Sequence, residues 1–128
     1  MLKDSKIFSS YSVNDLDKAR LFYSKTLGLN TSSPMNQLQL DFVDSRVFIY
    51  GKPNHEPATF TVLNFQVNNV EEMVDELITK GVVFEKYDSE YLKTDDKGIM
   101  HGGEGKGPTI AWFKDPAGNI LSIVQAGK

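Results

Sequence analysis

The sequence predicts an α+β fold in which two βαβββ modules form an open, eight-stranded cup with the helices on its outer face. Three observations support this prediction. Residues 61–81 repeat the pattern of residues 7–28, each copy changes from an alternating to a helical apolar period, and each copy is followed by sequence typical of a β-hairpin.

The repeated unit reads as a strand followed by a helix. The first copy is IFSSYSVNDLDKARLFYSKTLG and the second is TVLNFQVNNVEEMVDELITKG. Side chains alternate in character at the start of each copy, and apolar residues then recur every three to four positions, as on an amphipathic helix. We expect Asn14 and Asn68 to cap the helix N-termini, and Gly28 and Gly81 to end the helices in a left-handed conformation.

Further strands complete each module. Apolar, β-branched and aromatic runs bounded by turn residues mark their positions. The modules span about residues 5–52 and 59–126, and a linker containing Gly and Pro joins them into one domain over residues 1–128. The expected strands after the helices are 29–32, 37–42 and 46–50 in the first module and 82–86, 109–113 and 120–125 in the second.

Residues 87–107 differ from the rest of the chain. This segment holds five glycines and few apolar residues. Long connections inside domains are usually functional or disordered, so we predict a mobile flap over the mouth of the cup, with a passive loop as the alternative.

The composition narrows the classes of function. A length of 128 residues suits one domain, and a formal net charge of −3 provides no broad basic field for nucleic acid. The absence of cysteine excludes disulfides and thiolate metal sites. No apolar run is long enough to span a membrane, and the charged first ten residues do not resemble a signal peptide. We therefore expect a cytoplasmic protein without nucleic-acid or membrane partners.

The sheet faces opposite the helices are predicted to bind a small molecule. Alternation places aromatic and apolar side chains there together with hydroxyl and amide groups, which is the usual composition of a ligand pocket. A cup filled by its own side chains is the alternative, but buried polar groups would then need partners. The predicted ligand-binding residues are Phe8, Ser10, Tyr50, Val62, Asn64, Gln66, Trp112 and Ser122. The residues expected to face the helices are Tyr11, Val13, Phe65, Val67, Leu121 and Ile123.

Two motifs carry a family resemblance. VNDLDKARLFYSKTLGL at Val13–Leu29 resembles the opening signature of the vicinal oxygen chelate superfamily, and FKDPAGNIL at Phe113–Leu121 is similar to its closing signature. The superfamily includes glyoxalase I, the bleomycin resistance proteins and the extradiol dioxygenases. The resemblance implies paired βαβββ modules forming an open cup, commonly in a homodimer.

The resemblance also indicates where a metal would be bound. Its metal-dependent members place histidines and a glutamate at positions that correspond to Phe8, Val62 and Ser122 of this chain. The strand at residues 46–50, which supplies a further ligand in some members, has no carboxylate or imidazole. Because a divalent catalytic ion needs about three or four such ligands, we expect neither the usual metal site nor another cofactor.

The two histidines offer a weaker alternative. His55 and Glu56 lie in the linker, and His101 and Glu104 lie in the glycine-rich segment, so loops folded over the cup could share a metal ion. The competing interpretation is that both histidines are solvated loop residues, because ligands on mobile loops are poorly preorganised. His55 is also a weak candidate for a ligand contact or a general base.

Three functions remain. The first is a metal-independent protein that holds an apolar or aromatic small molecule in the cup, as the resemblance to the bleomycin resistance proteins implies. The second is a lyase, isomerase or dioxygenase-type enzyme with atypical metal ligands or metal-free acid–base chemistry. The third is a regulatory or protein-interaction domain with an empty cup.

Overall fold

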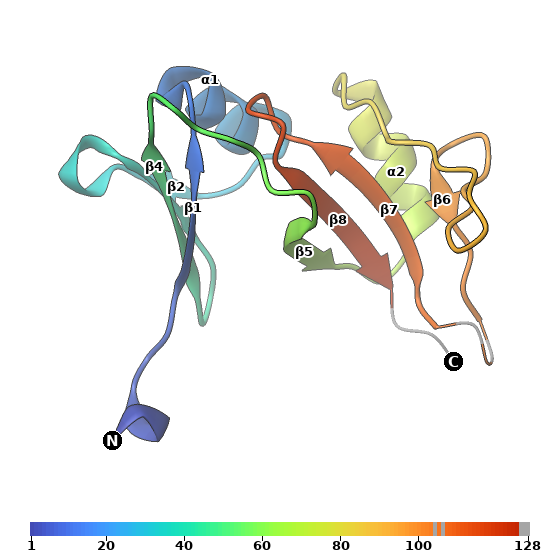
Figure 1. Ribbon diagram of the computed structural model, residues 1–128, viewed down its shortest axis with the longest axis horizontal. Helices are drawn as coiled ribbons and strands as arrows, with labels where there is room; N and C mark the ends of the chain where they lie inside the picture. The colour runs from blue at the N-terminus through green and yellow to red at the C-terminus, as the bar shows by residue number, and fades with distance from the viewer. Residues whose placement is uncertain (104, 106, 126–128) are drawn as a thin grey trace. The chain divides into compact units, whose positions relative to one another are not determined.

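The chain divides into two units, Met1–Pro57 and Ala58–Lys128, and each contains one four-stranded mixed sheet (Figure 1). The computed structural model describes residues 1–103, 105 and 107–125. Within these residues, no helix combines the length and the apolar character needed to cross a membrane.

In the first unit the strand order is β1-β4-β3-β2. β1 runs parallel to β4, and the other neighbouring strands are antiparallel. Helix α1 continues directly into a π-helical turn, η2. The elements are η1 (Leu2–Asp4), β1 (Ser9–Val13), α1 (Leu16–Leu21), η2 (Phe22–Thr26), β2 (Thr31–Ser32), η3 (Pro34–Asn36), β3 (Leu38–Asp41) and β4 (Arg46–Gly51).

The second unit has the same topology. Its strand order is β5-β8-β7-β6, with β5 parallel to β8 and the remaining pairs antiparallel. The elements are β5 (Thr61–Gln66), α2 (Val70–Thr79), β6 (Ile99–Met100), β7 (Thr109–Lys114) and β8 (Ile120–Gln125). The predicted α+β class and the repeated βαβββ order are therefore confirmed.

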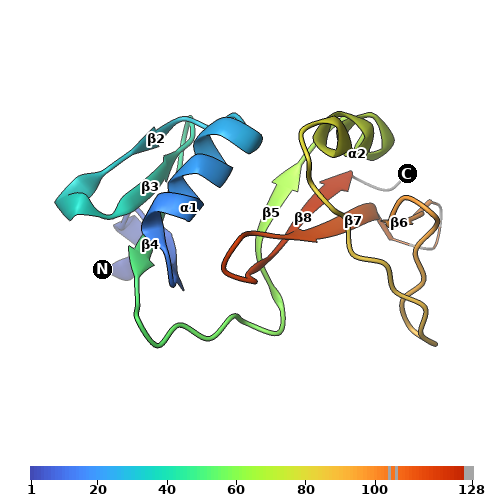
Figure 2. The ribbon, with the colours of Figure 1, turned by 90° about the horizontal axis from the view of Figure 1, so that it is seen from above.

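One face of each sheet packs against its helix, as Figure 2 shows. Tyr11 and Val13 are buried in the first unit, and the Tyr11 hydroxyl donates to the Tyr23 hydroxyl at 2.8 Å. In the second unit Leu121 and Ile123 are buried, and α2 contacts β7 and β8. Phe65 and Val67, also expected in the core, are half-buried. Because side chains alternate along a strand, the intervening positions project from the helix-free faces.

Both helices begin one residue later than predicted. The N-caps are Asp15 and Asn69, whose side chains accept from the amides of Lys18 at 3.1 Å and Glu72 at 3.0 Å. Asp15 and Asn69 keep extended dihedrals, so the residues before them remain outside the helix. The left-handed stops are confirmed at Gly28 and Gly81, which have φ of 70° and 93°.

The fourth strand of the second sheet is not where the sequence places it. Residues 82–86 form only an isolated bridge, between Phe84 and Phe113, and the strand β6 lies at residues 99–100, inside the segment predicted as a flap. The physical reason is a turn at Asp95, whose Oδ1 accepts from the amides of Lys97 and Ile99 and returns the chain to the edge of β7. The flap interpretation is therefore wrong for residues 99–100.

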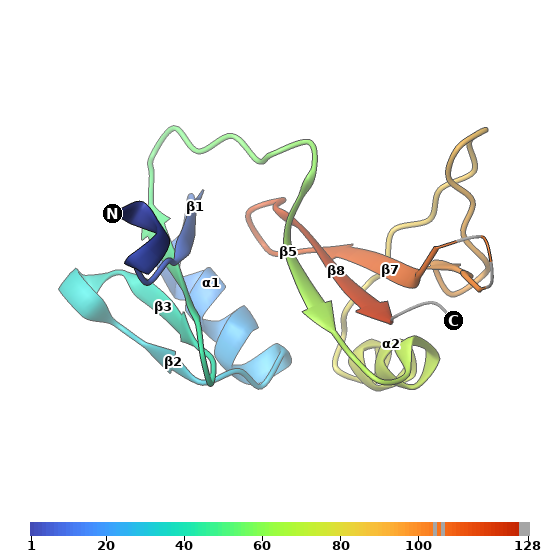
Figure 3. The same ribbon diagram turned by 90° about the horizontal axis from the view of Figure 1, so that it is seen from below.

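Residues 87–94 form a small projecting hairpin rather than an extended loop (Figure 3). An antiparallel bridge joins Asp88 to Lys93, and the Thr94 amide donates to the Tyr87 carbonyl at 2.9 Å. Tyr91 lies near the tip of this hairpin and is 90% exposed. Glu104 and Lys106 of the predicted flap lie outside the described residues.

The closing signature forms the turn between β7 and β8. Asp115 and Asn119 are buried there, although both are polar. Asp115 Oδ1 accepts from the amides of Ala117 and Asn119, each at 2.9 Å, and Oδ2 accepts from Asn119 Nδ2 at 3.0 Å. These bonds hold the turn closed, so the signature side chains have a structural role here.

Candidate functional site

The helix-free face of the second sheet brings three predicted ligand residues into one row. Asn64 on β5 is paired in register with Ser122 on β8, and Ser122 is paired with Trp112 on β7. The Asn64 side chain is exposed, Trp112 is half-buried and Ser122 is fully buried. We call Asn64, Ser122 and Trp112 the polar–aromatic row.

A short hydrogen bond joins two members of this row. The Ser122 hydroxyl donates to Asn64 Oδ1 at 2.5 Å. Ser122 has no exposed surface, so this bond satisfies a buried hydroxyl that would otherwise be costly to bury.

Trp112 has an aromatic neighbour that the sequence did not identify as a site residue. Tyr87 lies edge-on to the indole, with ring centroids 5.7 Å apart and ring planes at 83°. Tyr87 follows the bridge at Phe84 and enters the projecting hairpin. The sequence feature that could have identified Tyr87 as a site residue is its position directly after the predicted strand 82–86.

The remaining predicted residues of this sheet extend the same surface. Gln66 is exposed and pairs in register with Val124, which pairs with Ile110. Val62 is half-buried, and the β5–β8 register shifts between Thr61 and Leu63. Alternation therefore does not fix the direction of the Val62 side chain.

A charged pair lies near the row. Lys114 follows Trp112 on the same face of β7, and its Nζ lies 3.4 Å from Glu85 Oε1. The two opposite charges of this exposed pair offset one another in part.

The helix-free face of the first sheet has a different character. Phe48 and Tyr50 stack with centroids 6.3 Å apart, and the Arg46 guanidinium lies 4.6 Å from the centre of the Phe8 ring. Ser10 pairs in register with Phe48 and is exposed. Phe8, Ser10 and Tyr50 therefore all remain accessible within this unit.

His55 contacts this same sheet. Its Nδ1 lies 2.6 Å from the Ser12 hydroxyl of β1, and both side chains are half-buried. The His55 side chain is therefore held against β1 of the first unit by this hydrogen bond. A hydroxyl hydrogen-bonded to an imidazole is a pair that can transfer a proton.

The positions at which the resemblance places metal ligands do not form a donor set. Phe8 carries a phenyl ring that lies beside Arg46, and Val62 carries an isopropyl group. The Ser122 hydroxyl is buried and already bonded to Asn64. Divalent transition ions need imidazole, carboxylate or thiolate ligands, so these residues do not fit such an ion.

The second histidine is paired with a carboxylate. His101 Nε2 lies 2.6 Å from Asp95 Oδ2. Partial burial by itself would raise the pKa of Asp95, but hydrogen bonds from Ile99, His101 and Lys97 outweigh it and lower the pKa below its ordinary value. His101 follows β6, and its imidazole is held against the Asp95 turn that precedes this strand.

Lys97 links the Asp95 turn to α2 through ion pairs. Its Nζ lies 2.9 Å from Asp75 and 3.4 Å from Glu71 on α2. The hydrogen bond and charge of Asp75, followed by those of Glu71, raise the pKa of Lys97.

The atypical metal ligands suggested by the sequence come from both units: His55 and Glu56 from the first, and His101 and Glu104 from the second. Within the part of the chain that is described, no group of three or more His, Cys, Asp or Glu side chains could hold a metal ion. Glu104, named as a candidate ligand, lies outside the described residues, and Glu56 is exposed.

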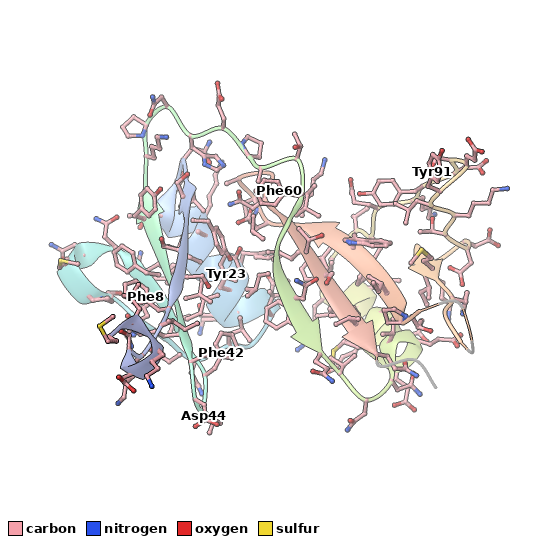
Figure 4. The ribbon with its side chains drawn as sticks, turned by 60° about the horizontal axis from the view of Figure 1, so that its bottom comes forward. Phe8, Tyr23, Phe42, Asp44, Phe60 and Tyr91 are labelled. Atoms are coloured by element: carbon pink, nitrogen blue, oxygen red, sulfur yellow. The ribbon has the colours of Figure 1, made fainter. Side chains whose placement is uncertain are left out.

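The structure shows surface depressions that the sequence did not predict. One of about 540 Å³ lies beside the β3–β4 turn, between Phe42 and the N-terminal residues Lys6 and Ile7. A second, of about 430 Å³, lies against Gly28, Leu29 and the same turn. Figure 4 shows Phe42 and Asp44 in this turn. The first depression is lined by Ile7 and Arg46, which lie next to the predicted ligand residue Phe8, whereas neither depression is lined by a predicted ligand residue itself.

Solved structures provide the comparison that decides the fold. A glyoxalase/bleomycin resistance protein from Streptomyces sp. CB03234 matches 94% of this chain and 100% of its own, with 20% sequence identity and a TM-score of 0.61. A lactoylglutathione lyase from Agrobacterium tumefaciens matches 94% of this chain and 93% of its own, with 18% identity and a TM-score of 0.63. The chain has the fold of the vicinal oxygen chelate superfamily.

Other matches to this vicinal oxygen chelate fold have different names. The match to a virulence protein from Salmonella typhimurium covers 95% of this chain and 97% of that protein's chain, at 17% sequence identity and a TM-score of 0.67. No family model matches the sequence, and no curated protein matches it. At these identities the likeness shows the vicinal oxygen chelate fold alone, and function must be argued from the residues.

Proposed function

We propose that this chain is a metal-independent small-molecule-binding protein that holds an aromatic ligand on the helix-free face of its second sheet. The observation that supports this most strongly is the polar–aromatic row with Tyr87 beside it. Trp112 offers an indole for stacking, Asn64 and Gln66 offer exposed amides, and an aromatic surface with a few polar groups is typical of ligand sites.

The chemistry of the metal positions supports the metal-independent part of the proposal. Phe8 and Val62 have no donor atom, and the Ser122 hydroxyl is occupied by Asn64. Stacking and hydrogen bonding therefore provide the affinity. Phe8, Ser10 and Tyr50 of the first unit are accessible and remain predicted ligand contacts.

A thermal-shift screen tests this proposal. Protein dialysed against EDTA is heated with a library of aromatic compounds, and a specific ligand should raise the melting temperature because it binds only the folded chain. The matched control is Trp112→Leu, which should lose the shift and keep the unliganded melting temperature within a few degrees. No shift across the library would refute the proposal and favour the protein-interaction domain.

One observation favours a second candidate, an enzyme of the lyase, isomerase or dioxygenase type. The 2.6 Å contact between His55 and Ser12 is suited to metal-free acid–base chemistry. Turnover of a ligand found in the screen, lost in His55→Gln but not in His101→Gln, would establish this function. Bound ligand recovered unchanged from the wild-type chain would exclude it for that compound.

We also propose a homodimer, as the resemblance implies, in a cytoplasmic setting. Light scattering coupled to size-exclusion chromatography tests the oligomeric state. A mass equal to one chain at micromolar concentration would refute the homodimer.

A further inference from the structure

The bond between Ser122 and Asn64 determines which groups the site presents. An asparagine amide has one oxygen that accepts and one nitrogen that donates two hydrogen bonds. Because Oδ1 accepts from the buried Ser122 hydroxyl, the nitrogen is left on the exposed part of the side chain. No described residue accepts a hydrogen bond from Asn64 Nδ2.

The amide cannot rotate without a penalty. If it turned over, Nδ2 would face the Ser122 hydroxyl, and Ser122 is fully buried. The hydroxyl proton would then lose the acceptor that it has in the structure. Buried polar hydrogens without an acceptor are strongly disfavoured, so Ser122 fixes the orientation of Asn64. Gln66, on the same strand, is exposed and makes no comparable bond with a described residue.

We propose that Ser122 is a positioning residue that holds the Asn64 N–H groups outward, so that the site selects planar aromatic ligands carrying a carbonyl group. This inference rests on the proposed function and specifies its ligand class. The carbonyl oxygen accepts from Asn64 Nδ2, and the ring stacks on Trp112. A neutral carbonyl suits this surface, because the nearby charges of Lys114 and Glu85 are already paired.

The spacing of the row sets the size of the ligand. Asn64 and Trp112 lie on the two strands that flank β8, and adjacent strands are about 4.8 Å apart, so their backbones are separated by roughly 10 Å. A fused two-ring system with a carbonyl substituent spans this distance. A single-ring ketone would reach only one of the two side chains.

Two naphthalenes that differ in one carbonyl test the inference. Trp112 is the single tryptophan of the sequence, so quenching of its fluorescence reports binding at the row. The wild-type chain should bind 2-acetylnaphthalene several-fold to about tenfold more tightly than 2-ethylnaphthalene, which corresponds to one net hydrogen bond. The readout is this affinity ratio, which a general loss of stability would not change selectively.

Three variants identify the residues responsible. Asn64→Asp still accepts from Ser122 but has no N–H donor, so the ratio should fall to about one. Asn68→Asp makes the same change at an exposed residue that follows β5 and lies outside the row, so it should leave the ratio unchanged within about twofold. Ser122→Ala frees the Asn64 amide to rotate and should lower the ratio in part. If Ser122→Ala does not fold, the Asn64 and Asn68 variants still decide the question.

The outcomes separate this inference from the proposed function. Equal binding of the two probes by the wild type, or an unchanged ratio in Asn64→Asp, would overturn the ligand class and leave aromatic binding intact. Failure of both probes to bind would overturn the inference. The proposed function falls as well only if the thermal-shift screen also finds no aromatic ligand.

Discussion

Gly98 provides a quantitative test of how the edge of the second sheet is built. It has φ of 87°, and a β-carbon added there would lie 2.8 Å from the Glu85 carbonyl oxygen and 2.9 Å from Phe84 Cβ. Gly81 has φ of 93°, but a β-carbon added there meets nothing within 4 Å. The two glycines share a backbone conformation and differ in crowding.

Replacing each glycine with alanine separates these two contributions. The left-handed conformation costs an alanine about 1–2 kcal/mol, which applies to both variants. The close contacts at Gly98 add an overpacking cost of about 1–3 kcal/mol. We therefore expect Gly98→Ala to lower the free energy of unfolding by about 2–5 kcal/mol and Gly81→Ala by about 1–2 kcal/mol.

Urea denaturation followed by Trp112 fluorescence measures the difference, because Trp112 lies in the same unit as both glycines. With an m-value of about 1–3 kcal/mol/M, the Gly98→Ala midpoint should fall roughly 1 M below that of Gly81→Ala. Equal midpoints for the two variants would refute the close approach of residue 98 to the 84–85 segment.

Three further predictions concern the second unit. Asn119→Ala removes the Nδ2 bond to buried Asp115 and should cost about 1–3 kcal/mol of unfolding free energy in urea; an unchanged midpoint would contradict the structural role of the turn. The folded-state pKa of Asp95 is lower than its ordinary value of 3.8, so Asp95 stabilises the fold at pH values above 3.8. This contribution is lost as the pH falls through the folded-state pKa. Asp95→Asn should therefore flatten the acid side of the stability–pH curve below about pH 4, and a curve parallel to wild type would show that Asp95 is not involved. Tyr87→Leu removes the edge-on partner of Trp112 and should weaken aromatic ligands by about twofold to tenfold in fluorescence titrations, whereas unchanged affinity would remove Tyr87 from the site.

The repeat was sufficient to predict the fold class and the order of elements. Alternation and helical period are local properties, and they correctly placed Tyr11, Val13, Leu121 and Ile123 in the cores. The helix starts were wrong by one residue because Asn-Asp and Asn-Asn pairs offer two candidate caps each. Which of the two caps the helix depends on where the preceding extended segment ends, and this is set by pairing with a distant strand.

The position of β6 and the hydrogen bond between Ser122 and Asn64 could not be predicted from the sequence. Residues 82–86 have a good strand pattern, but the turn at Asp95 brings residues 99–100 to β7 instead. Alternation placed Asn64 and Ser122 on one face, yet their bond depends on the β5–β8 register, which includes a shift near Val62. Pairing between strands nearly sixty residues apart is not encoded in a local period.

Whether aromatic binding needs a metal ion is measured most directly by titrating the wild-type chain with 2-acetylnaphthalene, once in EDTA and once with added zinc or manganese, while following Trp112 fluorescence. Stacking and the Asn64 amide predict dissociation constants that agree within about twofold in the two conditions. Quenching that appears only after the ion is supplied would contradict the account.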